Sequence, residues 1–371
     1  MKGNFVKLTS ALMSAIVLFV GIPYDASGTS VGINVNYHTA DEIKAYINDH
    51  PFDFSGSVFT TEPDYTNSPY SPGSLDQSTL QNALNALNTM RFIAGIDEVG
   101  LNSEYNEIAQ AGALLNAVNG TLSHNPNKPS DMSYELYTKG RTGTSSSNLG
   151  RGYDSLSQDI IYGWMSDAGS TSNVSTVGHR RWCLSPGMKE TGFGNVGRFY
   201  AMYVMDNVWA ETPYYGVCWP AQVMPMDYFD TDAPWSISMG NNVDISKVEV
   251  TLVRNLDGRT WKFSQSSSDG FFNVENSNYG KTGCIIFRPD DISYSDGDSF
   301  DVSITGLDED VNYSVEFADI FAEPVTEDTL TELINFILNR QYNAEEVVDF
   351  NGDDRIDVFD VVCVLKRLER Q

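Results

Sequence analysis

The stretch TVGHRRWCLSPGMKETGFG occupies residues 176–194, in the central part of the chain. It places His179 in a short polar turn beside a helix, within a mostly helical region over residues 78–206. A second histidine of the four, His124 in LSHNP, has a similar setting. Two imidazoles brought together in a cleft can bind Zn²⁺ or another borderline metal, or share a proton. They can equally be structural, hydrogen-bonded groups, and the absence of a third ligand favours that interpretation.

Six short motifs occur in the central region of the chain, two of them within this stretch. They are Asn88-Thr89-Met90-Arg91 with Gly95, Ser123-His124, Ser147-Asn148-Leu149, Trp164-Met165, Gly178-His179-Arg180, and the Gly-Phe-Gly of residues 192–194. This order resembles the CAP family (cysteine-rich secretory proteins, antigen 5, pathogenesis-related proteins), and its bacterial SCP-like branch in particular. The resemblance implies an α-β-α sandwich over residues 76–209. It also implies a cleft of two histidines and, in many members, two acidic residues, with His124, His179, Ser147 and Asn148 as candidates here.

The sequence departs from the family pattern at its acidic positions. Ser147 stands where the family has Glu, and residues 174–177 contain no carboxylate. General acid–base chemistry therefore loses its obvious base. We expect a cleft that binds a glycan, lipid or peptide without catalysis. The alternative is an extracellular hydrolase of polysaccharide or peptide with His124 and His179 in its centre.

Charge and the first residues indicate where the protein works. With 50 acidic and 23 basic residues, the net charge is −27. This balance disfavours nucleic acid and anionic membrane surfaces as partners. Residues 1–28 read as a signal peptide, with Lys2 and Lys7 before an apolar stretch and Ala26-Ser27-Gly28 as a cleavage site. A retained membrane anchor is the alternative. We expect a secreted, extracellular protein whose mature form has no membrane span.

Two further regions flank the central one. Residues 29–75 form an N-terminal extension or linker with one short helix, for which Thr39 and Glu42 have the spacing of a capping box. Residues 210–320 alternate with period two, as Val248, Val250 and Leu252 do, between Gly-containing turns. That pattern predicts an all-β, Ig-like sandwich.

The aromatic and cysteine residues leave alternatives open. Trp219, Trp235 and Trp261 are either core residues or stacking faces for sugars. The four cysteines are too few for a disulfide scaffold, although Cys183 and Cys218 can be paired. Cys363, in an apolar helical run, reads as a buried free thiol.

The stretch DFNGDDRIDVFD, residues 349–360, has the spacing of a calcium loop of the EF-hand type. Its oxygen donors are the side chains of Asp349, Asn351, Asp353, Asp357 and Asp360, with the carbonyl of Arg355. Calcium needs six to eight oxygens, which this set approaches. Asp354 replaces the usual glycine, and position 12 is Asp instead of Glu. The alternative is a solvated acidic turn.

This loop, with VVCVLKRL after it, resembles a type I dockerin over residues 323–371. The resemblance implies calcium-dependent docking onto a cohesin of a scaffoldin, and so a cellulosome at the cell surface. The first repeat offers Phe317, Phe321 and Val325 where ligands belong, so one Ca²⁺ site is expected. The resemblance makes Val358, Phe359, Lys366 and Arg367 the cohesin-facing residues; core packing is the alternative for the first two. The whole chain is thus predicted to be a multidomain α+β protein: CAP sandwich, β-sandwich, and small α-helical, EF-hand-like dockerin.

Overall fold

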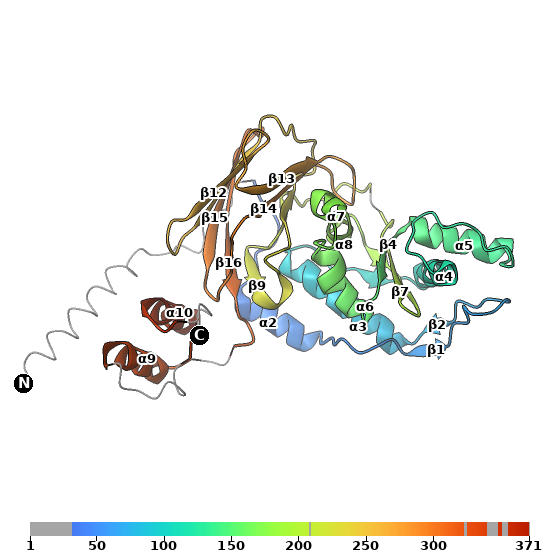
Figure 1. The fold of residues 1–371 in the computed structure, drawn as a ribbon, viewed down its shortest axis with the longest axis horizontal. Coiled ribbons are helices and arrows are strands. Elements are labelled where there is room, and N and C mark those ends of the chain that lie inside the picture. Colours follow the sequence, from blue (N-terminus) through green and yellow to red (C-terminus); the bar gives the residue numbers. More distant parts are fainter. Residues whose placement is uncertain (1–31, 208, 323–324, 340–347, 351–354, 371) are drawn as a thin grey trace, which may run out of the picture.

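The computed structural model describes residues 32–207, 209–322, 325–339, 348–350 and 355–370 (Figure 1). These residues form a mixed α/β structure with several helices and sheets. The predicted signal peptide at 1–28 lies outside them. Among the described residues, no helix is both long and apolar enough to cross a membrane.

The predicted N-terminal helix is confirmed as α2 (Ala40–Asp49). The Thr39 hydroxyl accepts a hydrogen bond from the Glu42 amide at 3.2 Å, and the Thr39 amide donates to the Glu42 carboxylate at 2.8 Å. This capping box satisfies two amides at the helix start that would otherwise lack partners. The helix buries Ile43, Tyr46 and Ile47. The strands β1 (Phe59–Thr61) and β2 (Ser74–Leu75) follow and pair antiparallel.

The helical region is built around a three-stranded antiparallel sheet of order β4-β7-β6. Its strands are β4 (Ser147–Arg151), β7 (Phe199–Tyr203) and β6 (Phe193–Val196). Helix α4 (Ser103–Asn119) packs against β6 and β7, and α5 (Tyr134–Ser145) packs against α4. The π-helix η1 (Asp159–Met165) contacts β4 and α3 (Gln77–Ile93). The arrangement is compatible with the predicted α-β-α sandwich.

Short elements complete this region. They are β3 (Gly100–Leu101), which pairs in parallel with β5 (Glu190–Thr191), and the helices α6 (Leu156–Gln158), α7 (Thr171–Thr176) and α8 (Gly178–Cys183). Glycines allow the close approach of α4 and α5, because a Cβ at Gly112 would lie 2.8 Å from the backbone of Gly143. The lobe formed by these two helices stands apart on the right of Figure 1.

The predicted β-rich region consists of two sheets. One has the order β13-β14-β10-β8, with strands Gly270–Glu275, Cys284–Pro289, Trp235–Ser238 and Val217–Trp219. The other has the order β12-β11-β15-β16-β9, with strands Thr260–Ser264, Glu249–Arg254, Ser299–Thr305, Val311–Ala318 and Val223–Pro225. Every pairing is antiparallel except that of β16 with β9. Val250 and Leu252 are buried as predicted; the Ig-like topology stays a prediction.

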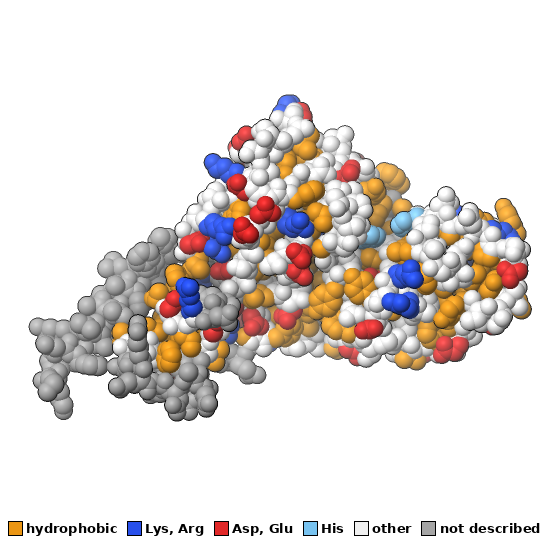
Figure 2. Space-filling view, in the orientation of Figure 1, with side chains coloured by type: hydrophobic (Ala, Val, Ile, Leu, Met, Phe, Trp, Pro, Cys, Tyr) orange, Lys and Arg blue, Asp and Glu red, His pale blue; other side chains and the backbone are white. Residues whose placement is uncertain are grey.

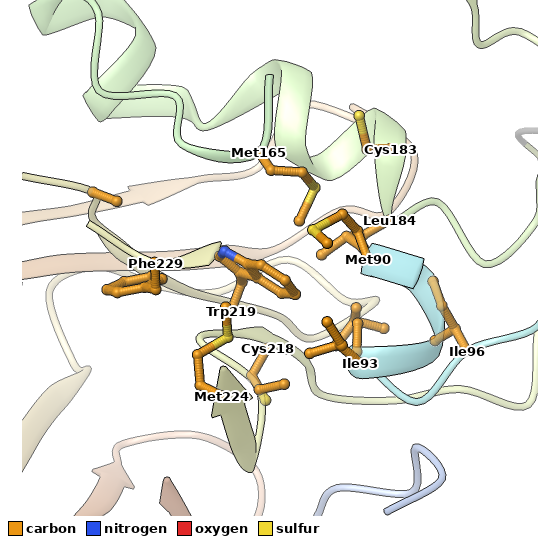
Figure 3. Packing of buried hydrophobic residues seen from close by; sticks show 14 of the residues in the cluster. Met90, Ile93, Ile96, Met165, Cys183, Leu184, Cys218, Trp219, Met224 and Phe229 are labelled. Carbon is orange, nitrogen blue, oxygen red and sulfur yellow. The ribbon is translucent and has the colours of Figure 1, made fainter. Parts of the chain in front are cut away.

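The helical and β-rich regions share one hydrophobic core. Its largest cluster combines residues of α3 and η1 with residues of β8, β9 and the other strands. Figure 3 shows Trp219 in the middle of this cluster, with Met90 and Ile93 on one side and Phe229 on the other. The predicted boundary between residues 209 and 210 is thus crossed by continuous packing.

Buried side chains decide two of the alternatives left open by the sequence. Trp219, Trp235 and Trp261 are at most 3% exposed, so they are core residues and not stacking faces for sugars. All four cysteines are buried and free, so the pairing of Cys183 with Cys218 does not occur.

The C-terminal unit, α9 (Glu327–Asn339) and α10 (Val358–Arg370), has a small core of its own. Val325 and Leu333 pack there against Val361 and Val364. Leu338, near the end of α9, is exposed.

Candidate functional site

Residues 144–148 form hydrogen bonds with both cleft histidines. The His124 ring lies in an exposed turn, with Nδ1 2.8 Å from the carbonyl oxygen of Thr144. Four residues later, the Asn148 amide donates to the carbonyl oxygen of His179 at 2.9 Å. The end of α5 and the start of β4 therefore anchor both histidine turns. Figure 2 shows histidine side chains close together at a hollow between the α4–α5 lobe and the surface over α7 and α8.

His179 is held by a buried aspartate that sequence reasoning missed. Its Nδ1 lies 2.7 Å from Oδ1 of Asp167, whose side chain is fully buried. The other Asp167 oxygen accepts from the Arg180 amide at 3.1 Å. Burial alone would lower the pKa of His179, but the hydrogen bond to Asp167 and the charge of Asp167 raise it. The imidazole is therefore fixed in orientation and favoured in its protonated form.

A second missed carboxyl group, Asp159, lies at the start of η1. It is 1% exposed, and its Oδ2 has no hydrogen-bond partner among the described residues. Burial raises the pKa of Asp159 to about 8, against the opposing effect of the His179 charge. A Cβ at Gly150 would lie 1.5 Å from this Oδ2, so only glycine fits there. At neutral pH Asp159 is thus mainly a neutral acid near His179.

These two aspartates correct the expectation that no carboxylate serves the cleft. The residues directly before Gly178-His179 indeed carry none. However, Asp167, which precedes α7 in the chain, hydrogen-bonds to the His179 ring. Asp159 lies still earlier in the chain, at the start of the π-helix η1. Asp167 lies two residues after the recognised Trp164-Met165 motif, and this position in the sequence could have identified it as a cleft residue.

Ser147 and Asn148 have different surroundings. Both are buried on β4. The Ser147 hydroxyl has no hydrogen-bond partner in the described part of the chain. The NH₂ group of Asn148 donates twice, since it also contacts the Cys183 sulfur at 3.4 Å. Asn148 therefore positions the His179 turn, whereas Ser147 leaves a polar atom unsatisfied, which costs about 1–3 kcal/mol when buried.

The His179–Asp167 couple is able to accept or donate a proton, since a carboxylate orients the ring through Nδ1. Because a carbonyl oxygen only accepts, Nδ1 of His124 must donate to Thr144. In their neutral forms, both rings then carry a lone pair on Nε2. Within the described ranges, no three His, Cys, Asp or Glu side chains are grouped to hold a metal ion.

The predicted calcium loop is described only in part. Asn351 and Asp353 lie outside the described residues. Asp360 is fully buried, and its two oxygens accept from the amides of Phe350 at 2.8 Å and Asp357 at 2.7 Å. This carboxylate thereby brings the two ends of the loop together. Carboxylate and amide oxygens at the remaining positions, Asp349 among them, are the donors that Ca²⁺ prefers, so the residues fit the ion.

The predicted cohesin-facing residues fall into two pairs. Val358 and Phe359 are 48% and 42% exposed, so core packing does not account for them. Lys366 and Arg367 instead lie against the β-rich region. The Lys366 ammonium donates to the Gly297 carbonyl, and the Arg367 guanidinium pairs with Asp296.

Comparison with known proteins supports the assignment of the central region. Residues 84–210 match the model of the family described as CAP, the Cysteine-rich secretory protein family. The match covers His124, Ser147, Asn148 and His179, together with the two aspartates beside His179. No curated protein matches the chain.

Proposed function

We propose that this is a secreted CAP-domain protein whose cleft binds a polar ligand without catalysis, and whose C-terminal unit docks onto a cohesin of a scaffoldin. The observation that carries the cleft proposal is the fixed orientation of both rings. His124 and His179 each bind an oxygen through Nδ1, which leaves Nε2 of each ring for a ligand. A glycan, peptide or lipid headgroup with hydroxyl groups, which can both donate and accept a hydrogen bond, suits this pair.

The cleft is tested with full-length protein and the variants His124→Ala and His179→Ala. Binding of cell-wall glycans, casein peptides and lipid vesicles is measured by calorimetry, alongside hydrolysis of polysaccharide and casein. We expect no hydrolysis by the parent protein, and binding of one ligand class that both variants weaken. His38→Ala is the matched control, because that histidine stacks on Phe92 outside the cleft.

A hydrolase is the second candidate, and one observation favours it. The buried Asp167 holds His179 as the acid of a catalytic couple would, and the unsatisfied Ser147 hydroxyl lies next to Asn148, which binds the His179 backbone. Hydrolysis that is lost in both His179→Ala and Asp167→Asn would favour this alternative over binding.

The docking proposal rests on the donor pattern of residues 349–360 and on the Asp360 carboxylate that ties the loop ends together. When bound, Ca²⁺ would supply a rigid centre between Asp349 and the start of α10. Asp349, Asn351, Asp353, Asp357 and Asp360, with the Arg355 carbonyl, would hold it.

Calorimetric titration of the intact chain with Ca²⁺, and capture by a panel of cohesins with and without chelator, test the docking. We expect one Ca²⁺ per chain and capture that chelation abolishes. Asp349→Ala should remove both, whereas Asp328→Ala, which removes an exposed acid in the first turn of α9, should remove neither. Capture that survives chelation would contradict the proposal.

A further inference from the structure

A surface pocket of about 360 Å³ lies where the helical and β-rich regions meet, apart from the histidine cleft. Four chain segments line it: Pro186 after α8, residues 209–212, Gly240 after β10, and the loop between β13 and β14. Its polar side chains include Glu211, Thr212, Asn278, Lys281 and Thr282. The volume lies within the range of about 300–1,000 Å³ that small-molecule sites occupy.

Trp209 gives this pocket an unusual wall. It is 80% exposed, while the other five of the six tryptophans, all described, are buried or half-buried. A single exposed indole needs no explanation by itself, but this one borders a pocket. The flat face of an indole is suited to stacking against the C–H face of a sugar ring.

One wall of the pocket, the β13–β14 loop, is held in place by contacts with α8, so this loop loses little order on binding. Arg181 of α8 donates to the backbone carbonyls of Ser277 and Lys281, which fixes the β13–β14 loop against the helix. Its guanidinium also lies 5.1 Å from the centre of the Tyr279 ring. At Gly280, which has a φ of 81°, a Cβ would lie 2.6 Å from the Arg181 carbonyl oxygen. The loop and α8 therefore touch at a position that only glycine fits.

Two polar groups at the pocket have hydrogen-bonding capacity left, whereas the Thr282 hydroxyl already donates to the Asn276 carbonyl at 2.5 Å. The Lys281 ammonium makes one long contact, 3.5 Å to the Thr212 hydroxyl, and no ion pair with any described residue. Partial burial lowers the pKa of Lys281. The Asn278 amide oxygen is buried without a partner among the described residues. Donors and acceptors thus surround the indole, and Lys281 and Glu211 offset each other in charge.

We propose that this pocket binds a neutral saccharide, stacked on Trp209 and hydrogen-bonded by Lys281, Glu211 and Thr212. The ligand class follows from the combination of one exposed indole with mixed donors and acceptors and no net charge. The net charge of −27 further disfavours polyanionic glycans. This site goes beyond the proposed function, because it uses neither the histidine cleft nor the C-terminal unit.

The test uses full-length protein with cellohexaose, xylohexaose and chitohexaose as neutral probes and a galacturonate hexamer as the anionic one. Binding is followed by calorimetry and by tryptophan emission. We expect saturable binding of a neutral probe with a blue shift of the emission, since Trp209 is the one exposed indole. Trp209→Ala should weaken binding at least about tenfold and remove the shift.

Matched variants separate this pocket from other sites. Tyr134→Ala removes a comparably exposed aromatic ring, 75% exposed, on the α4–α5 lobe and should leave binding unchanged. Lys281→Met should weaken binding with the fold intact, as judged by circular dichroism. If no neutral probe binds, if Trp209→Ala binds as the parent does, or if the galacturonate hexamer binds more tightly, the proposal is wrong. Binding lost only in His124→Ala and His179→Ala would assign the sugar to the cleft and also overturn it.

Discussion

At the scale of single residues, the contact between His179 and Asp167 governs the chemistry of the cleft. The pKa of His179 is raised in the folded chain: burial opposes the shift, but the hydrogen bond and charge of Asp167 outweigh it. A raised folded pKa means that the native state binds the proton more tightly than the unfolded chain does. The contact therefore stabilises the fold fully below about pH 6.5 and less as pH rises through the folded pKa of His179.

Asp167→Asn should lower the pKa of His179, because the amide keeps an acceptor for Nδ1 but removes the charge. It should also destabilise the fold by about 1–3 kcal/mol, since an amide NH₂ then faces the Arg180 amide. NMR titration of the His179 ring and thermal unfolding at pH 5.5 and 8.5 measure both effects. The lowered pKa of His38, which burial causes and Glu42 opposes, should not change. An unchanged His179 titration would contradict this account.

Asp159 should give the protein a second pH dependence. Its pKa is raised to about 8 by burial, so the native state holds the proton over a range in which the unfolded chain has lost it. Stability from this group is complete below about pH 4 and is lost as pH rises toward 8, by at most about 1.4 kcal/mol per pH unit. Asp159→Asn should therefore be more stabilising, relative to the parent, at pH 8 than at pH 5. Unfolding by urea at both values checks this, and the exposed Asp154→Asn should show no such trend.

The sequence predicted part of the cleft, and the missing part has a physical reason. His124, Ser147, Asn148 and His179 come from motifs whose residues are adjacent in the chain. Asp167 is separated from His179 by a whole helix and reaches it because Val177, with a φ of 41°, turns the chain back. Valine rarely adopts a positive φ, so residue propensities do not predict a turn at this position. Trp209 was not recognised either, because exposure of a single indole depends on tertiary packing.

At the scale of elements, buried arginines join the helical region to the sheets. Arg180 of α8 is 1% exposed and donates to the carbonyls of Met165 at 2.6 Å and Ser166 at 2.7 Å. It also donates to the carbonyl of Pro234, just before β10, and to the hydroxyl of Ser236, on β10, at 3.0 Å. The planar guanidinium reaches these acceptors together, which an ammonium group cannot do.

Arg180→Lys should therefore destabilise the protein by about 3–5 kcal/mol, because buried carbonyls and a buried charge are left unsatisfied. Urea unfolding followed by circular dichroism measures the loss. Arg288→Lys is the matched control on β14, where the arginine makes one 3.2 Å contact with the Asp232 carbonyl. We expect a change of less than about 0.5 kcal/mol there. Equal losses in the two variants would show that Arg180 does not join the regions.

The element pattern was largely predictable, whereas the joining of the regions was not. Thr39 and Glu42 marked the start of α2, and alternation of Val248, Val250 and Leu252 marked β11, because both signals are local. The common core of Met90, Trp219 and Phe229 depends on contacts between residues far apart in the chain. A composition change near residue 210 carries no information on such packing.

At the scale of the whole molecule, two separate cores imply two units of stability. The C-terminal unit packs on Val325, Leu333, Val361 and Val364 and shares none of them with the large core. Its contacts with the β-rich region are polar: Cys363 donates to the Asp296 carbonyl at 3.4 Å, and Arg367 pairs with the Asp296 carboxylate. A contact made by few polar groups is opened more easily than a shared apolar core.

Arg367→Gln should release the C-terminal unit from the β-rich region without unfolding either, because the substitution changes none of the buried residues of either core. Small-angle scattering should show a larger maximum dimension than in the parent, while the main thermal transition stays within about 2 °C. Lys262→Gln removes the same charge from an exposed position on β12 and should change neither quantity.

If the docking proposal is right, Lys366 and Arg367 cannot bind cohesin and Asp296 together, so cohesin must compete with this contact. The parent should then expand on cohesin binding, as Arg367→Gln does alone; an unchanged dimension in both would show that the two sets of contacts use different faces.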